Sequence, residues 1–92
     1  MKKEFVKELN NLSLKLEVNP ILYRCIVAEA LVLARKGDFP PTDEEVYNIT
    51  KRALKKVDNT YAVRCTNSTF PFRSYGKELV EEVLEEMGQK KR

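Results

Sequence analysis

The chain has 92 residues, of which 42% are hydrophobic and 34% are charged, and its formal net charge is +3 at pH 7. These values fit one soluble domain over residues 1–92, and charged residues interrupt the apolar stretches too often for a transmembrane helix. With no His and two Cys, the chain cannot build a Ser–His or Cys–His nucleophilic site or an ordinary zinc site. We therefore expect no enzymatic activity, no metal and no cofactor. The N-terminus has no secretory segment, so we expect a cytoplasmic protein.

Four apolar side chains in the first sixteen residues recur at helical spacing. They are Phe5, Leu9, Leu12 and Leu16. Side chains that are three, four or seven residues apart lie on one face of a helix. The sequence therefore predicts an amphipathic helix over about residues 2–16, with this stripe toward the core.

The second predicted helix opens at Asn19-Pro20, because Asn is a favoured N-cap and Pro is well tolerated at the first helical position. Residues 21–36 are apolar on nearly every side. We expect a helix of this kind to be central and covered by the others. The basic pair before Gly37 is typical of a helix end, with the glycine just beyond it.

Two residues of this second helix could carry chemistry, Glu29 and Cys25. Glu29 falls within the apolar stripe, where a carboxylate needs a partner. We expect Arg24, Tyr23, a helix N-terminus or a neighbouring basic side chain to hold it, in preference to a role as an acid with a raised pKa. Cys25 and Cys65 are expected to be reduced thiols in the cytosol, the alternative being a disulfide.

The third predicted helix begins after Pro40-Pro41, a pair that cannot be helical. Thr42 and Glu45 have the spacing of a capping box, and acids in the first turn favour the positive end of the helix dipole. The helix is expected to run to about Val57. Its core-facing residues are Val46, Ile49, Ala53 and Val57.

The opposite face of this third helix is polar and basic, and no acid occurs between Val46 and Val57. Arg and Lys can contact phosphate or guanine, and Asn can contact adenine. Residues 46–76 carry six bases and one acid, which suggests a positive surface. The candidate nucleic-acid-binding residues are Asn48, Lys51, Arg52, Lys55, Arg64 and Arg73. The alternative is an ordinary solvent-facing set of charges.

Residues 58–72 precede the last helix and contain an alternating stretch over Tyr61 to Cys65. We expect a short β segment or an ordered loop there, whose aromatic residues either anchor the loop in the core or stack on single-stranded nucleic acid. The last helix is predicted over about residues 74–87, with an acidic outer face, and residues 89–92 form a basic tail. The resulting fold class is all-α, a small bundle of about four helices.

Scattered short matches over about residues 18–84 resemble the DNA-binding effector domain of the master sporulation response regulator of endospore-forming bacteria. The matches are Val18-Asn19-Pro20, Glu29-Ala30-Leu31, the segment 42–57 and Thr66-Asn67-Ser68. The resemblance implies a DNA-reading role for Arg52 and Lys55 and a phosphate-side position for Asn67-Ser68. This chain departs from the pattern between Gly37 and Thr42, which leaves no room for the helix before the recognition helix.

Two functions follow as hypotheses. The first is a small DNA-binding regulatory domain of a helix-turn-helix-like type, because the charge of residues 46–76 is strongly positive. The second is a protein-interaction adaptor or a homodimer, because a basic helix and an acidic helix in one chain could join two copies or recruit a partner protein.

Overall fold

The computed structural model describes residues 1–58 and 71–88. Within these ranges the chain forms four helices and no strand: α1 (Lys3–Lys15), α2 (Pro20–Leu33), α3 (Asp43–Lys56) and α5 (Phe72–Glu86). The predicted all-α class is confirmed. The β segment or loop expected around residues 61–65 and the basic tail at 89–92 lie outside the described residues.

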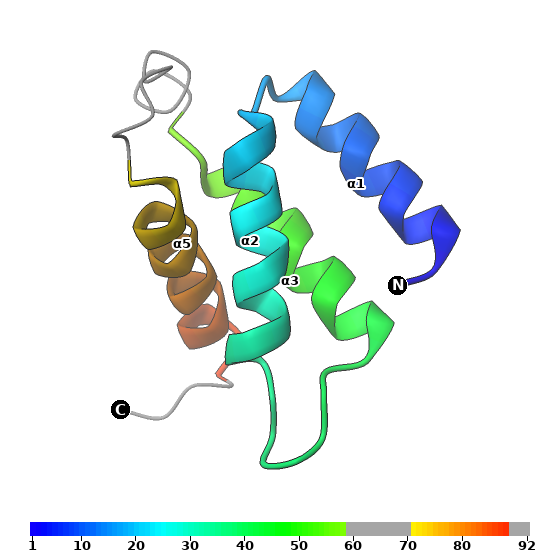
Figure 1. The fold of residues 1–92 in the computed structure, drawn as a ribbon, viewed down its shortest axis with the longest axis vertical. Coiled ribbons are helices and arrows are strands. Elements are labelled where there is room, and N and C mark those ends of the chain that lie inside the picture. Colours follow the sequence, from blue (N-terminus) through cyan, green and yellow to red (C-terminus); the bar gives the residue numbers. More distant parts are fainter. Residues whose placement is uncertain (59–70, 89–92) are drawn as a thin grey trace.

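Three of the helices, α2, α3 and α5, pack on one another, whereas α1 packs chiefly on α3. Figure 1 shows α2 in front of α3, with α5 on one side and α1 on the other. The ends of α1 and α2 meet at the turn around residues 16–19, and the two helices diverge from there. The fully buried apolar residues of the core include Leu9, Leu22, Ile26, Ile49, Leu54, Val80 and Val83.

The predicted helix starts at Asn19 and Thr42 are confirmed. The Asn19 side-chain oxygen accepts a hydrogen bond from the Ile21 backbone N–H at 2.8 Å. The Glu45 backbone N–H donates to the Thr42 hydroxyl at 3.2 Å, and the Thr42 backbone N–H donates to the Glu45 carboxylate at 3.4 Å. This reciprocal pair is the capping box, and it satisfies two backbone donors that the helix itself cannot.

The end of α1 places a non-glycine residue in the left-handed region. Glu17 has φ 56°. Its backbone N–H donates to the Leu14 carbonyl at 3.1 Å, and the Val18 N–H donates to the Ser13 carbonyl at 2.9 Å. This pattern is a Schellman motif, in which glycine is the usual residue because it has no Cβ to crowd the backbone.

Two predicted helix boundaries differ from the structure. The second helix ends at Leu33 instead of near Gly37, because Lys36 and Phe39 exchange both backbone hydrogen bonds at 3.1 Å across a tight turn, with Gly37 at φ 64°. The last helix begins at Phe72, two residues earlier than predicted. The Pro71 carbonyl accepts the Tyr75 N–H there, and the buried Phe72 side chain anchors the first turn.

The expectation that α2 is central and covered by the other helices holds only for the side that faces α3 and α5. Ile21, Leu31 and Val32 remain 54%, 47% and 63% exposed. The reason is the arrangement of the helices. The helices α3 and α5 cover one side of α2, whereas α1 packs on α3 and does not cover the opposite side of α2. An apolar face of the most hydrophobic helix is therefore open to solvent.

Candidate interaction surfaces

Four of the six predicted nucleic-acid-binding residues lie together on α3. Asn48, Arg52 and Lys55 are exposed, and Lys51 is half-buried with its ammonium 5.7 Å from the centroid of the Tyr47 ring. None of the three cations forms an ion pair with a described acidic residue. We call these four residues the basic strip of α3. Arg64 lies outside the described residues.

Acidic groups flank the basic strip of α3 on both sides. Toward α1, the Tyr47 hydroxyl donates a 2.5 Å hydrogen bond to the Glu8 carboxylate, and the Tyr47 ring stacks on Phe5 with centroids 4.6 Å apart. Toward α5, Lys56 is paired with Glu86. These carboxylates weaken the positive potential that a phosphate backbone would meet at the strip.

Arg73, the remaining predicted residue, lies on the side of α5 that faces α2. Its Nε is 3.6 Å from Oε1 of Glu29, whose side chain is 12% exposed. The buried carboxylate of α2 is thus held by a neighbouring basic side chain, as the sequence predicts; no ion pair or hydrogen bond to Arg24 or Tyr23 is found in the described residues. Arg73 is itself 89% exposed, so this pair is largely solvated.

Two adjoining hollows follow the boundary between α2 and the first turns of α5. One has a volume of about 240 Å³ and is mainly apolar; it is lined by Ile21, Arg24, Cys25, Ala28, Glu29, Val32 and Arg73. The other, of about 340 Å³, adds Leu33, Ser74 and Lys77. Both hollows are lined by Glu29, Val32 and Arg73, so they adjoin, and we refer to the two together as the α2/α5 groove. Among the described residues, the charged groups that line it are three cations and one carboxylate.

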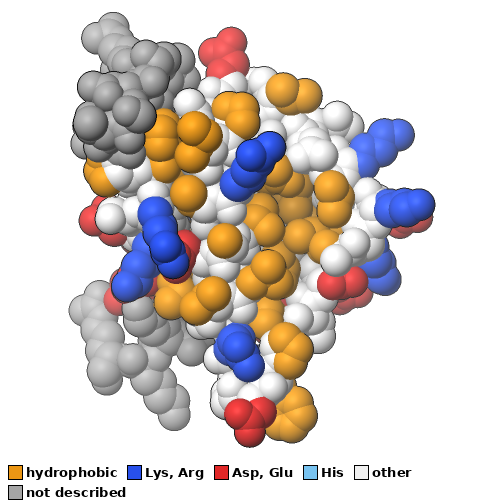
Figure 2. Space-filling model, viewed as in Figure 1, with side chains coloured by type: hydrophobic (Ala, Val, Ile, Leu, Met, Phe, Trp, Pro, Cys, Tyr) orange, Lys and Arg blue, Asp and Glu red, His pale blue; other side chains and the backbone are white. Residues whose placement is uncertain are grey.

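The α2/α5 groove borders the exposed side of α2. We define the outer face of α2 as the residues after Pro20 that are exposed to solvent: Ile21, Arg24, Ala28, Leu31 and Val32. Figure 2 shows apolar side chains gathered along the middle of this side of the molecule, with Lys and Arg side chains around them. The outer face of α2 therefore combines exposed apolar side chains with basic side chains around them.

The half-buried Cys25 thiol at the groove does not have the properties of a nucleophile. Burial raises the pKa of Cys25, the positive charge of Arg73 lowers it and the negative charge of Glu29 raises it, with a net upward shift. A raised pKa keeps the thiol protonated near neutral pH, whereas the thiolate is the reactive form. Among the described residues no group of His, Cys, Asp or Glu side chains could hold a metal ion.

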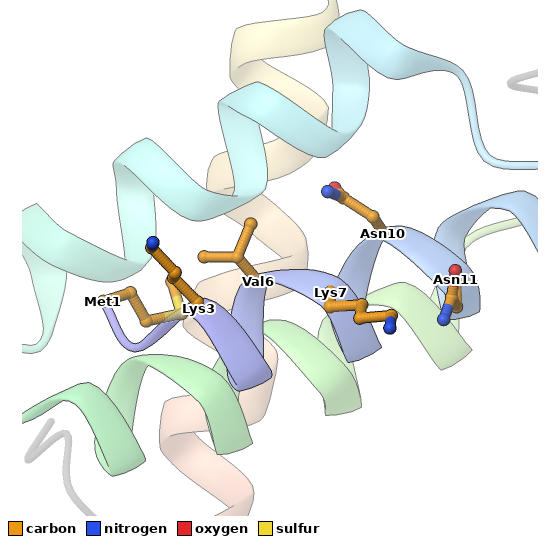
Figure 3. A pocket seen from close by; sticks show the side chains of 6 residues that line it. All are labelled: Met1, Lys3, Val6, Lys7, Asn10 and Asn11. Atoms are coloured by element: carbon orange, nitrogen blue, oxygen red, sulfur yellow. The ribbon is translucent and has the colours of Figure 1, made fainter.

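A third hollow, of about 370 Å³, lies along the exposed side of α1. Figure 3 shows the side chains that line it, all from the start of the chain and from α1: Met1, Lys3, Val6, Lys7, Asn10 and Asn11. None of these described lining residues carries a carboxylate that could act with the two lysines in proton transfer. Within residues 1–58 and 71–88, only the start of the chain and α1 contribute side chains to this hollow, so we base no site on it.

The α2/α5 groove and the exposed apolar face were not among the sites predicted from the sequence. A signal for them was present in α2, whose apolar residues surround the whole helix. Each of the other helices offers a single apolar stripe, and the stripe of α1 is used on α3. The apolar stripes of the other three helices also cover one another, so they cannot cover every side of α2. Part of α2 therefore stays exposed to solvent.

Comparisons of the chain with protein-family models, with curated proteins and with solved structures gave no match. Among the described residues, no helix combines the length and the apolar character needed to cross a membrane.

Proposed function

We propose that this chain is a small protein-interaction module that binds through the outer face of α2. The observation that carries the proposal is the exposure of Ile21, Leu31 and Val32 on the most apolar helix, at 54%, 47% and 63%. Burying an aliphatic side chain fully contributes about 1.5–3 kcal/mol. Covering the exposed half of three such side chains would therefore contribute roughly 3 kcal/mol to binding.

Protein association also costs several kcal/mol in lost freedom of motion, so this apolar contribution has to be supplemented by contacts around it. The α2/α5 groove offers such contacts beside the apolar face, through its charged residues and its hollow shape. Together the groove and the outer face of α2 have the layout of an interface, with an apolar centre and a polar rim.

The proposal is tested by site-specific photo-crosslinking of the full chain in the cells that make it. A photoreactive residue at Val32, on the outer face of α2, is compared with one at Lys55, on the basic strip of α3. We expect a discrete protein adduct from Val32 that disappears when Ile21→Glu is also introduced. Adducts of the same kind from Lys55, or adducts from Val32 that survive Ile21→Glu, would contradict the proposal. An adduct of two copies of the chain would identify the partner as a second copy.

DNA binding through the basic strip of α3 is the second candidate function. It is favoured by the exposure of Arg52 and Lys55 and by the absence of an ion pair between the strip and a described acid. Because acids flank the strip on both sides, we rank this function below protein binding.

The DNA-binding candidate has a direct test in fluorescence anisotropy with a mixed-sequence duplex. Binding through several phosphates should weaken by orders of magnitude between about 50 and about 200 mM salt. The variant K51E/R52E/K55E should lose this binding, while the control R24E/K77E, which reverses charges at the α2/α5 groove, should retain most of it. Equal losses in both variants, or no binding at the lower salt concentration, would exclude the basic strip of α3 as a DNA-binding surface.

A further inference from the structure

We infer that the partner segment seated on the outer face of α2 is an acidic amphipathic helix from another protein. This inference rests on the proposed function and adds the chemical class of the partner. It follows from three properties of the surface: its spacing, its length and its charge.

The apolar groups of α2 that face solvent have the spacing of a helix-binding surface. Ile21, Ala28 and Val32 follow one another at intervals of seven and four residues, which places them in a row along the helix. The α2/α5 groove runs beside this row and is lined by the same three residues. An amphipathic helix lays its own row of apolar residues into a groove of this kind.

The length of the surface sets the length of the partner. From Ile21 to Val32 the helix rises by roughly 17 Å, at 1.5 Å for each residue. A partner helix of about 12–18 residues would cover this distance and part of each end. No strand edge is available among the described residues, so a partner that adds a β-strand does not fit this surface.

The charge of the surface selects an acidic partner. Arg24 and Lys77 are exposed at the α2/α5 groove, and neither forms an ion pair with a described acidic residue. Arg24 lies beside the hollow nearer Ile21, and Lys77 lies beside the hollow that includes Leu33, so cations accompany the groove along its length. The Glu29 carboxylate is mostly buried and is paired with Arg73. A partner with carboxylates flanking its apolar stripe would meet complementary charge, and a basic partner would be repelled.

A second copy of this chain meets these requirements less well. If two outer faces of α2 packed together about a two-fold axis, the Arg24 side chain of each copy would lie in the same contact, next to a like charge. The acidic face of α5 has complementary charge, with Glu78, Glu82 and Glu85 exposed. However, the large exposed apolar residues of the described chain are at Met1, on α1 and α2, and in the turn after α2, not on α5. That face could not cover Ile21 or Val32 with apolar groups.

The inference is tested with the full chain and two designed 18-residue helical probes. Both probes carry the same leucine stripe, flanked by Glu in the acidic probe and by Lys in the basic probe. Fluorescence anisotropy should give a dissociation constant at least about tenfold lower for the acidic probe, and this preference should shrink as salt is added.

Matched charge-reversal variants identify the surface that the probe uses. R24E/K77E changes two cations at the α2/α5 groove, and the control K51E/K55E changes two on the basic strip of α3. R24E/K77E should weaken binding of the acidic probe by about tenfold or more and improve binding of the basic probe, whereas K51E/K55E should change either by less than about threefold. An equal loss in the control, or no binding of the acidic probe up to about 1 mM, would overturn the inference.

Failure of this inference and failure of the proposed function give different results. If the two probes bind with equal dissociation constants and Ile21→Glu abolishes the binding of both, the outer face of α2 is a binding surface but charge does not select its partner. If the acidic probe binds and is insensitive to Ile21→Glu as well as to R24E/K77E, both statements are wrong. A concentration-dependent dimer in sedimentation equilibrium that Ile21→Glu dissociates would replace the acidic helix with a second copy.

Discussion

Truncation of two isoleucines in α2 compares the open and the covered sides of one helix. Ile26 is fully buried and Ile21 is 54% exposed, so the change Ile→Ala removes the same atoms from two different surroundings. For Ile26→Ala we expect a loss of about 2–5 kcal/mol in the free energy of unfolding, because the lost burial and the cavity add together. For Ile21→Ala we expect a loss below about 1 kcal/mol, because about half of the side chain is already in water and alanine favours the helix.

The assay is urea denaturation of each variant, followed by circular dichroism at the helix band. The slope against urea is about 1–3 kcal/mol per molar for a small domain, so a difference of 1 kcal/mol shifts the urea midpoint by roughly 0.3–1 M and the two variants should be well separated. An equal slope against urea in the two variants and the parent protein would show that all three unfold in the same way. If Ile21→Ala cost as much as Ile26→Ala, the outer face of α2 would be covered in the isolated protein, and the reasoning that makes it a binding surface would be refuted.

Three further predictions test packing, backbone strain and electrostatics. A Cβ at Gly76 would lie 3.2 Å from the Cys25 Cβ. Gly76→Val should therefore lower the free energy of unfolding by about 1–3 kcal/mol, because the added side chain would overpack the contact. An unchanged urea denaturation curve would refute the close approach of α5 to α2. Glu17→Gly should raise the unfolding free energy by about 0.5–1 kcal/mol by relieving the left-handed residue, and a lower thermal midpoint would contradict that account. The hydrogen bond to Glu8, followed by burial and by the negative charge of that residue, raises the pKa of Tyr47. The hydrogen bond between Tyr47 and Glu8 should stabilise the fold below the pKa that Tyr47 has in the unfolded state. This stabilisation should be lost as pH rises through the pKa of Tyr47 in the folded state. The difference in unfolding free energy between the parent protein and Tyr47→Phe should therefore become smaller toward alkaline pH. If urea denaturation gave the same difference in unfolding free energy across that pH range, the hydrogen bond would not be the cause of the raised pKa.

The sequence was most informative where local chemistry decides the structure. Asn19 and Thr42 cap helices because their side-chain oxygens reach backbone donors two or three residues away, and such spacing is visible in the sequence. The core-facing stripe of α3 was also predicted correctly, since Ile49 and Ala53 are buried. A single stripe on a helix leaves little choice about which side faces the core.

The sequence was least informative where the answer depends on how the helices are arranged. The apolar residues of α2 surround that helix, so its pattern gives no indication of which side stays exposed. Only the packing of α1 on α3 decides that Ile21 and Val32 face solvent. The sequence predicts a basic partner for Glu29. That this partner is Arg73 depends on the close approach of α5 to α2 at Gly76. Contacts between residues so far apart in sequence do not follow from local spacing.

The resemblance to the sporulation regulator domain and the predicted roles of Arg52 and Lys55 in DNA binding stay predictions. The structure describes an exposed basic strip on α3, which such a role would need, and an exposed apolar face on α2, which it would not. The two surfaces belong to different helices, so variants that change one leave the residues of the other unaltered.

The most direct test of the central claim is a chemical-shift map of the ¹⁵N-labelled full chain titrated with the acidic helical probe. The acidic probe could bind at either basic surface, so the shift map distinguishes binding at the α2/α5 groove from binding at the basic strip of α3. The account predicts that the largest amide shifts lie in residues 21–33 and 73–77. Largest shifts in residues 48–55, with α2 unaffected, would contradict it.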